Sequence, residues 1–159
     1  MLPSWAWVPL SCVALSCNPN TSRPPVQPML GAAIIEVELD VPTATAEVAE
    51  ALRRDSIPVA VLEPRDGYLE TPWFESATGT PTTQRPLGPD VVRVRAWVDV
   101  EQPGHSRITV EVVYRPWADP SLPDRELERI APADHPVTRR AQAALARVSG
   151  QPPAPVEPE

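Results

Sequence analysis

The clearest pattern in this sequence is a strict alternation of apolar and polar residues within positions 90–117. Valine or alanine occupies every even position from 92 to 100, whereas the odd positions from 93 to 101 carry arginine, tryptophan or acidic residues. After a Gln-Pro-Gly-His sequence at 102–105, a second alternating run continues to Tyr114. A period of two places each set of side chains on one face of a strand, and a Pro-Gly pair favours a turn. The pattern therefore predicts a β-hairpin with one apolar face and one solvent-exposed face.

An earlier part of the chain also alternates. Residues 33–41 place aliphatic side chains opposite acidic ones, which predicts a first strand with an acidic outer face. If this strand lies beside the central hairpin, its carboxylates face the arginines of that hairpin, and we expect Glu38 to pair with Arg95. Such an exposed pair would fix the register of the strands more than their stability, because it contributes only about 0.2–1 kcal/mol.

A second hairpin is predicted between the first strand and the central hairpin. Residues 59–63 and 68–74 are rich in β-branched and aromatic side chains, and an Asp-Gly pair suited to a tight turn lies between them. Pro72 has no amide proton to donate to a central ladder. This strand is therefore expected at an edge of the sheet or at a bulge.

Two helices complete the predicted fold. The first has Thr43 as its N-cap and ends before Pro58, and the second has Asp134 as its N-cap and ends at Gly150. Between the central hairpin and the second helix, residues 117–134 predict a long proline-broken excursion with one or two helical turns. The elements together predict an α+β fold, in which a twisted antiparallel sheet of about five strands packs against two helices.

Composition narrows the classes of function. All 14 basic residues are arginine, which excludes phosphate-loop or Schiff-base lysine chemistry. The formal net charge of −7 argues against a nucleic-acid partner, because phosphate binding requires a concentrated basic surface. Both cysteines lie within the first 17 residues, so the predicted folded region has no disulfide and no thiolate metal site.

The N-terminal residues predict where in the cell the protein is located. Residues 1–16 form an uncharged apolar run that is too short to span a bilayer but suits a secretory signal peptide. The sequence Ala-Leu-Ser-Cys that ends at Cys17 resembles the lipobox of bacterial lipoproteins, which implies acylation of Cys17 and a membrane anchor. Asn18, which stands where an aspartate often signals retention at the inner membrane, favours the outer membrane by the same resemblance. The alternative is that the apolar run forms a buried strand or helix of the domain.

The domain organisation follows from this signal and from proline content. Residues 17–30 are polar and proline-rich and are expected to form a tether between the anchor and the domain. Residues 31–149 are expected to form the α+β domain, and residues 150–159 a disordered acidic tail.

Candidate catalytic groups are scarce. The two histidines, His105 in a predicted turn and His135 beside a predicted helix start, do not match a metal-ligand spacing. The sequence contains no serine nucleophile elbow and no dinucleotide-binding glycine pattern. We therefore expect a protein that is not an enzyme and that needs no cofactor or metal.

The aromatic residues indicate binding instead. Tryptophan and tyrosine are enriched at the energetic centres of protein interfaces. The candidate partner-binding residues are Trp73, Phe74, Trp97 and Trp117, of which Trp97 lies on the strand face expected to be solvent-exposed. The alternative is that the C-terminal helix or the long loop covers Trp97.

The order strand, helix, hairpin, hairpin, helix and the sequence Gly-Tyr-Leu-Glu-Thr-Pro-Trp-Phe at 67–74 resemble the helix-grip domains of BamC-type (NlpB/DapX-type) outer-membrane lipoproteins. The resemblance implies a non-enzymatic, lipid-anchored module on the periplasmic side of the outer membrane, which binds other envelope proteins and is accessory to outer-membrane assembly. The alternative function is a periplasmic carrier, because a sheet wrapped around a helix can enclose a small apolar ligand.

Overall fold

The computed structural model describes residues 21–84 and 87–150 of the 159-residue chain. Within these residues the strands are β1 (Ala33–Val37), β2 (Val61–Glu63), β3 (Tyr68–Glu70), β4 (Phe74–Glu75), β5 (Gly88–Gln102), β6 (His105–Arg115) and β7 (Arg129–Ile130). The helices are α1 (Val41–Arg54), α2 (Asp124–Leu127) and α3 (Pro136–Ser149). The predicted signal peptide, Cys17 and residues 151–159 lie outside the described residues.

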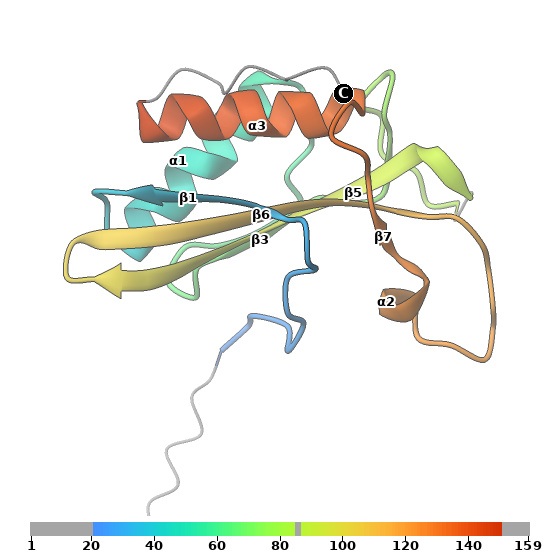
Figure 1. Ribbon diagram of the computed structural model, residues 1–159, viewed down its shortest axis with the longest axis horizontal. Helices are drawn as coiled ribbons and strands as arrows, with labels where there is room; N and C mark the ends of the chain where they lie inside the picture. The colour runs from blue at the N-terminus through green and yellow to red at the C-terminus, as the bar shows by residue number, and fades with distance from the viewer. Residues whose placement is uncertain (1–20, 85–86, 151–159) are drawn as a thin grey trace, which may run out of the picture.

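The strands form one open antiparallel sheet with the order β1-β6-β5-β3-β2, and α1 and α3 cover one of its faces (Figure 1). The short strands β4 and β7 pair with β5 and β6 respectively. The predicted α+β class, an antiparallel sheet packed against two helices, is confirmed. The sheet has seven strands where about five were expected, because two-residue strands carry too short a pattern to be read from the sequence.

The central hairpin forms as the alternation predicts. β5 and β6 pair along most of their length, with Val94 opposite Val112 and Ala96 opposite Val110. The even-numbered side chains at 92–98 of β5 and 108–112 of β6 pack against α1 and α3, and with them form the main core. Gly104 in the turn has a φ of 78°, in the left-handed region that glycine adopts without strain.

The helix caps differ from those predicted. The carboxylate of Asp40 accepts a hydrogen bond of 2.9 Å from the backbone N–H of Thr43, so Asp40, and not Thr43, is the N-cap of α1. Hydrogen bonding to Thr43 also lowers the pKa of Asp40. At α3, Nδ1 of His135 accepts from the N–H of Val137, which makes His135 the N-cap in place of Asp134.

The strand predicted at 68–74 is divided by Pro72. β3 lies inside the sheet between β2 and β5, whereas β4 pairs with β5 and forms an isolated bridge with Pro81. Gly67, directly before β3, approaches β5 so closely that a Cβ atom would lie 2.1 Å from the carbonyl oxygen of Val98. Its φ of 63° also favours glycine, so this close approach depends on the missing side chain.

The first strand has a different neighbour from the one expected. β1 pairs with β6 and is separated from β5 by the width of that strand. The predicted pair between Glu38 and Arg95 is therefore wrong. Glu36 lies opposite Arg107 of β6 instead, with 3.6 Å between the carboxylate and the guanidinium.

The second face of the sheet, opposite α1 and α3, is partly covered. Residues 21–30, which we call the N-terminal strap, lie against part of it (Figure 1). Ser22 bonds to Asp66 and Arg23 to Asp99 at one end, and the backbone N–H of Met29 donates to Glu111 further along. Residues 21–30 of the predicted tether therefore pack against the domain.

Candidate functional site

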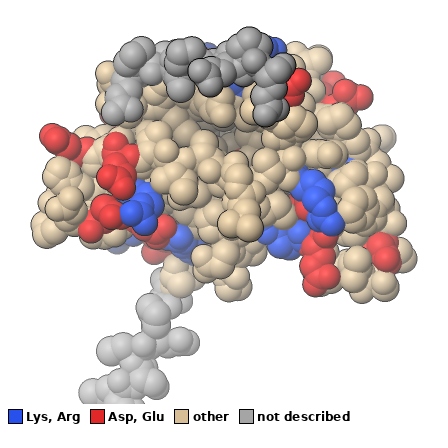
Figure 2. Space-filling view, in the orientation of Figure 1, with Lys and Arg blue, Asp and Glu red and all other residues tan. Residues whose placement is uncertain are grey.

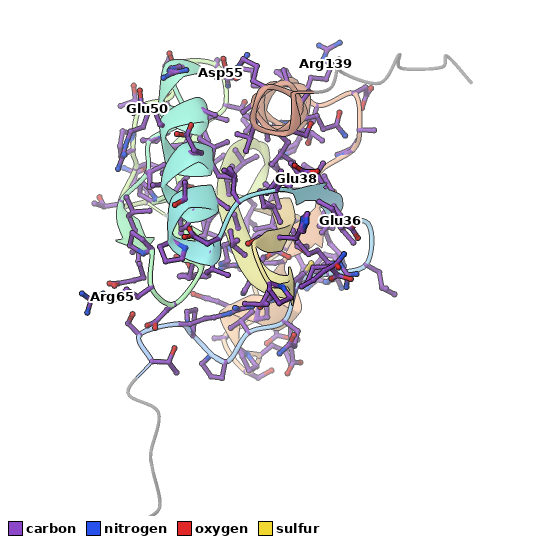
Figure 3. The ribbon with its side chains drawn as sticks, turned by 90° about the vertical axis from the view of Figure 1, so that its left-hand side faces the viewer. Glu36, Glu38, Glu50, Asp55, Arg65 and Arg139 are labelled. Atoms are coloured by element: carbon purple, nitrogen blue, oxygen red, sulfur yellow. The ribbon has the colours of Figure 1, made fainter. Side chains whose placement is uncertain are left out.

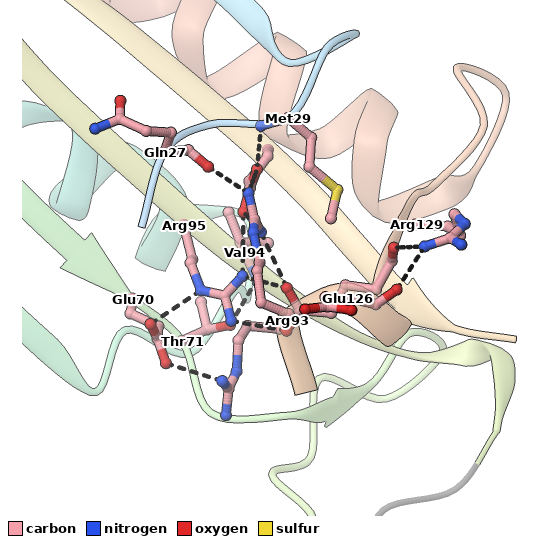
Figure 4. Close-up of polar contacts among 12 residues, drawn as sticks. Gln27, Met29, Glu70, Thr71, Arg93, Val94, Arg95, Glu126 and Arg129 are labelled. Carbon is pink, nitrogen blue, oxygen red and sulfur yellow. Dashed lines mark hydrogen bonds and ion pairs between the residues drawn. The ribbon is translucent and has the colours of Figure 1, made fainter. Parts of the chain in front are cut away.

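The chemically richest part of the structure is a group of charged side chains beneath the strap (Figure 4). Arg95, on β5, lies at its centre. Its Nε is 3.1 Å from a carboxylate oxygen of Glu70 and its Nη1 is 3.1 Å from Glu111, while both Nη atoms bond to Glu128 at 2.7 and 2.8 Å. The side chains of Glu111 and Glu128 are 0% and 1% exposed. Three carboxylates thus surround one almost fully buried guanidinium.

A second arginine connects this group to the rest of the chain. Arg125, on α2, donates to Glu111 at 2.5 and 3.0 Å and to Glu128 at 3.0 Å. Its Nη2 also donates to the carbonyl oxygen of Gln27 in the strap at 2.5 Å, and Met29 of the strap donates to Glu111. We call Glu70, Arg93, Arg95, Glu111, Arg125 and Glu128 the buried ion network. It joins the strap, the 117–134 excursion and the sheet.

The charges of the network balance, since three arginines face three glutamates. Burial alone would raise the pKa of Glu128, but the hydrogen bonds and positive charges of Arg95 and Arg125 outweigh it and lower the pKa. Burial and a hydrogen bond from the hydroxyl of Tyr68 to Glu70 raise the pKa of Tyr68. These shifts keep Glu128 ionised and Tyr68 protonated, and neither group is poised for proton transfer near neutral pH.

Two of the predicted contact residues lie inside the protein. Two guanidiniums lie over the ring of Trp73, with Arg93 4.8 Å and Arg115 5.2 Å from the ring centroid. Phe74 belongs to the main core and has no exposed surface. Both side chains therefore stabilise the fold, and neither is available to a partner on the folded surface.

Trp97 is also covered, which corrects its expected exposure. Its side chain is 0% exposed and packs against Tyr68, with 5.9 Å between the ring centroids. On β5 it lies between Arg95 and Asp99, the two positions where the network and the strap are bound, so the strap passes over it. The covering element is not α3, which lies on the other face of the sheet (Figure 1).

Trp117 is the predicted contact residue that keeps an accessible surface. It lies just after β6 and is 43% exposed, and the guanidinium of Arg129 stacks on its ring at 4.5 Å. The fourth candidate is thus held in place by the β7 strand while one side of its ring faces solvent. Cys17, the predicted lipidation site, lies outside the described residues.

Within residues 21–84 and 87–150, no group of three or more His, Cys, Asp or Glu side chains is placed to hold a metal ion. No helix in these ranges is long and apolar enough to cross a membrane. His135 caps α3, and its Nε2 lies 3.0 Å from the carbonyl oxygen of Pro89. Apolar side chains fill the space between the sheet and its two long helices.

The buried ion network was missed because its members are far apart in sequence. Glu111 interrupts a run of valines on β6, and the alternating charges of 124–129 belong to a segment read only as helical turns. An acidic residue among valines is a signal of burial or pairing, because an unpaired buried carboxylate is costly. Its partner could not be identified from the sequence, since Arg95 and Arg125 reach it only through the fold.

The lowered pKa of Glu128 predicts a specific dependence of stability on pH. A carboxyl group whose pKa is lower in the folded protein than in the unfolded chain, where it is about 4.3, stabilises the fold at pH values above this. This stabilisation is lost as the pH falls through the pKa of the folded state. The difference in unfolding free energy between wild type and Glu128→Gln should therefore be largest at pH 7 and shrink below about pH 4.3. Urea unfolding from pH 7 to pH 3 measures it; an equal difference at both ends would show that the Glu128 charge is not stabilised.

Comparison with known proteins adds no assignment to this geometry. No family model matches the chain, and no curated protein is significantly similar to it.

Proposed function

We propose that this chain is a lipid-anchored protein of the bacterial cell envelope, whose α+β domain is a non-catalytic protein-interaction or scaffold module. The observation that carries the proposal is the Ala-Leu-Ser-Cys sequence ending at Cys17, preceded by an uncharged apolar run. Acylation of this thiol gives stable anchoring when two or more chains are attached, since each buried methylene contributes about 0.8 kcal/mol. The resemblance noted above favours the periplasmic side of the outer membrane and a role accessory to outer-membrane assembly.

The strap supports this proposal by defining how the domain would be held. Ser22 is bound to Asp66, and only four residues separate it from Cys17. Five residue steps span at most about 18 Å. An acylated Cys17 would therefore hold the domain close to the membrane, at the end of the sheet where the strap begins.

The described charges support a non-catalytic role. The glutamates of the buried ion network are bonded to arginines, and the network connects three segments of the chain. A carrier would need an enclosed apolar cavity between the helices and the sheet, where core side chains are packed instead. Trp117, with its exposed ring, is the proposed aromatic contact for an envelope partner.

The anchor is tested by labelling. Full-length protein expressed in a diderm bacterium with labelled palmitate should carry the label and fractionate with membranes. Cys17→Ser should lose both properties. Cys12→Ser is the matched control, because it removes the other thiol in the same apolar region, and should keep the label. Label retained in Cys17→Ser, or absent from the wild type, would refute the anchor.

A further inference from the structure

One edge of the sheet carries backbone groups without partners in the described structure. β1 is the outer strand beside β6, and no described strand pairs with its other side. In an antiparallel sheet, successive residues direct their N–H and C=O groups alternately to the two sides of the strand. The hydrogen bonds of the neighbouring strands therefore determine which residues of β1 face outward.

The alternation can be followed from β3 to β1. Val94 bonds to Thr71 and the N–H of Val98 donates to Gly67, so the even-numbered residues of β5 face away from β6. The odd-numbered residues of β5 and β6 therefore bond to each other, and the even-numbered residues of β6 face the opposite side. The N–H of Ala131 accordingly donates to the carbonyl of Val112.

The register then places the free groups on two residues of β1. Ala33, Ile35 and Val37 lie opposite even-numbered residues of β6 and bond to them. The N–H and C=O groups of Ile34 and Glu36 must face outward, and no described residue bonds to them. The side chain of Ile34 is 61% exposed. Two outward-facing residues at alternate positions of one strand are a template on which another extended chain can add.

The surroundings of this edge are hollow, and three glutamates line them beside Arg147, whose guanidinium pairs with Asp55. Residues Glu36 to Leu39, the end of α3 and the β5–β6 turn line a depression of about 650 Å³. Glu36 and Glu101 share the single cation Arg107, and no described cation lies within ion-pair distance of Glu38. Glu36 and Glu38 project from the margin of the sheet in Figure 3, and Figure 2 shows acidic side chains gathered at this end of the molecule.

We propose that β1 is a docking edge that adds an extended segment of a partner protein with basic side chains at alternate positions. The outward backbone groups of Ile34 and Glu36 would form the added ladder. One basic side chain would lie against Glu36 on β1, and another two residues along would lie near Glu38 in the bend that follows this strand. The proposal deepens the proposed interaction role but is independent of the anchor at Cys17.

Charge selects this occupant over others. A second copy pairing β1 with β1 would bring no cation to Glu36, because residues 33–37 contain one glutamate and no basic residue. The chain's own residues 151–159 carry two glutamates and no basic residue, so they too would bring no cation. The opposite edge, β2, has three residues followed by Pro64, and offers a shorter template.

The charge requirement is tested with two peptides added to the full-length protein in neutral detergent. The blocked peptide TVKVKVT reads the same in both directions, so strand polarity does not matter, and TVEVEVT is its acidic counterpart. We expect binding of the basic peptide only. Glu36→Gln combined with Glu38→Gln should weaken it about fivefold, since each exposed pair contributes modestly. The matched control, Glu47→Gln with Glu50→Gln on exposed α1 positions, should bind as wild type.

The backbone requirement has its own readout. On addition of the basic peptide, hydrogen exchange should slow at the amides of Ile34 and Glu36, whereas the amides of Ile35 and Val37 should be protected beforehand. Ile34→Pro removes an outward N–H without breaking the ladder to β6, so it should keep the fold and abolish binding. Circular dichroism verifies the fold of each variant.

Three results would overturn the proposal. Unchanged exchange at Ile34 and Glu36 with millimolar basic peptide would exclude strand addition at β1. Equal binding of the two peptides would exclude selection by the acidic edge. A dimer in sedimentation that Ile34→Pro dissociates would assign the edge to a second copy. Absence of the palmitate label from the wild type would refute the anchor at Cys17 but not the docking edge at β1. The two proposals can therefore fail separately.

Discussion

Replacement of Arg95 by alanine is expected to destabilise the domain by about 3–5 kcal/mol. Arg95 is 6% exposed and bonds to Glu70, Glu111 and Glu128, and the last two have side chains with almost no exposed surface. Removal of the guanidinium leaves buried carboxylates with fewer partners, and this desolvation cost exceeds the net value of the pair itself. Urea unfolding at pH 7, followed by circular dichroism, measures the loss.

The control for this prediction is an arginine in an exposed pair. Arg54 and Glu50 pair at 3.4 Å on α1, and both side chains are more than half exposed. Arg54→Ala should therefore cost no more than about 0.5 kcal/mol. Similar costs for Arg95→Ala and Arg54→Ala would show that the network is solvated and does not hold the strap and excursion to the sheet.

Replacement of Trp97 by alanine is expected to cost about 3–5 kcal/mol. The indole has no exposed surface and contacts Tyr68, so truncation leaves a cavity beneath the strap. Its Nε1 has no hydrogen-bond partner among the described residues. Trp97→Phe should therefore lose packing area alone and cost about 1–2 kcal/mol, which keeps the test informative if the alanine variant does not fold.

Trp117→Ala distinguishes burial from surface contact. Trp117 is 43% exposed, so its truncation should change the unfolding free energy by less than about 1 kcal/mol, including its stacking with Arg129. Thermal unfolding of both tryptophan variants provides the comparison. A larger loss of stability in Trp117→Ala than in Trp97→Ala would contradict the burial of Trp97.

Several elements follow from local patterns alone. The alternation in 90–117 defines β5, β6 and the turn between them, because a period of two is a property of one strand and needs no knowledge of its neighbours. The helices were placed correctly, but their caps were not. Asp40 and Thr43 both suit an N-cap, and only the backbone conformation decides which of them receives the N–H bond.

The candidate site was less predictable. Alternation separates the two faces of a strand but does not say whether the polar face meets water or another segment. Trp97 and Arg95 lie on that face, and the strap and the 117–134 excursion return to cover it. Proline and polar residues made both segments look like free loops, since composition reports the lack of regular structure and not the lack of packing.

The hairpin, the two long helices and the α+β class follow from patterns within single segments of the chain. Strand order, the partners of Arg95 and the free edge at β1 depend on contacts between distant segments. The two kinds of interaction differ in range. Side-chain periodicity and capping act within a few residues, whereas ion pairing and burial on the second face join positions up to 98 residues apart, such as Gln27 and Arg125.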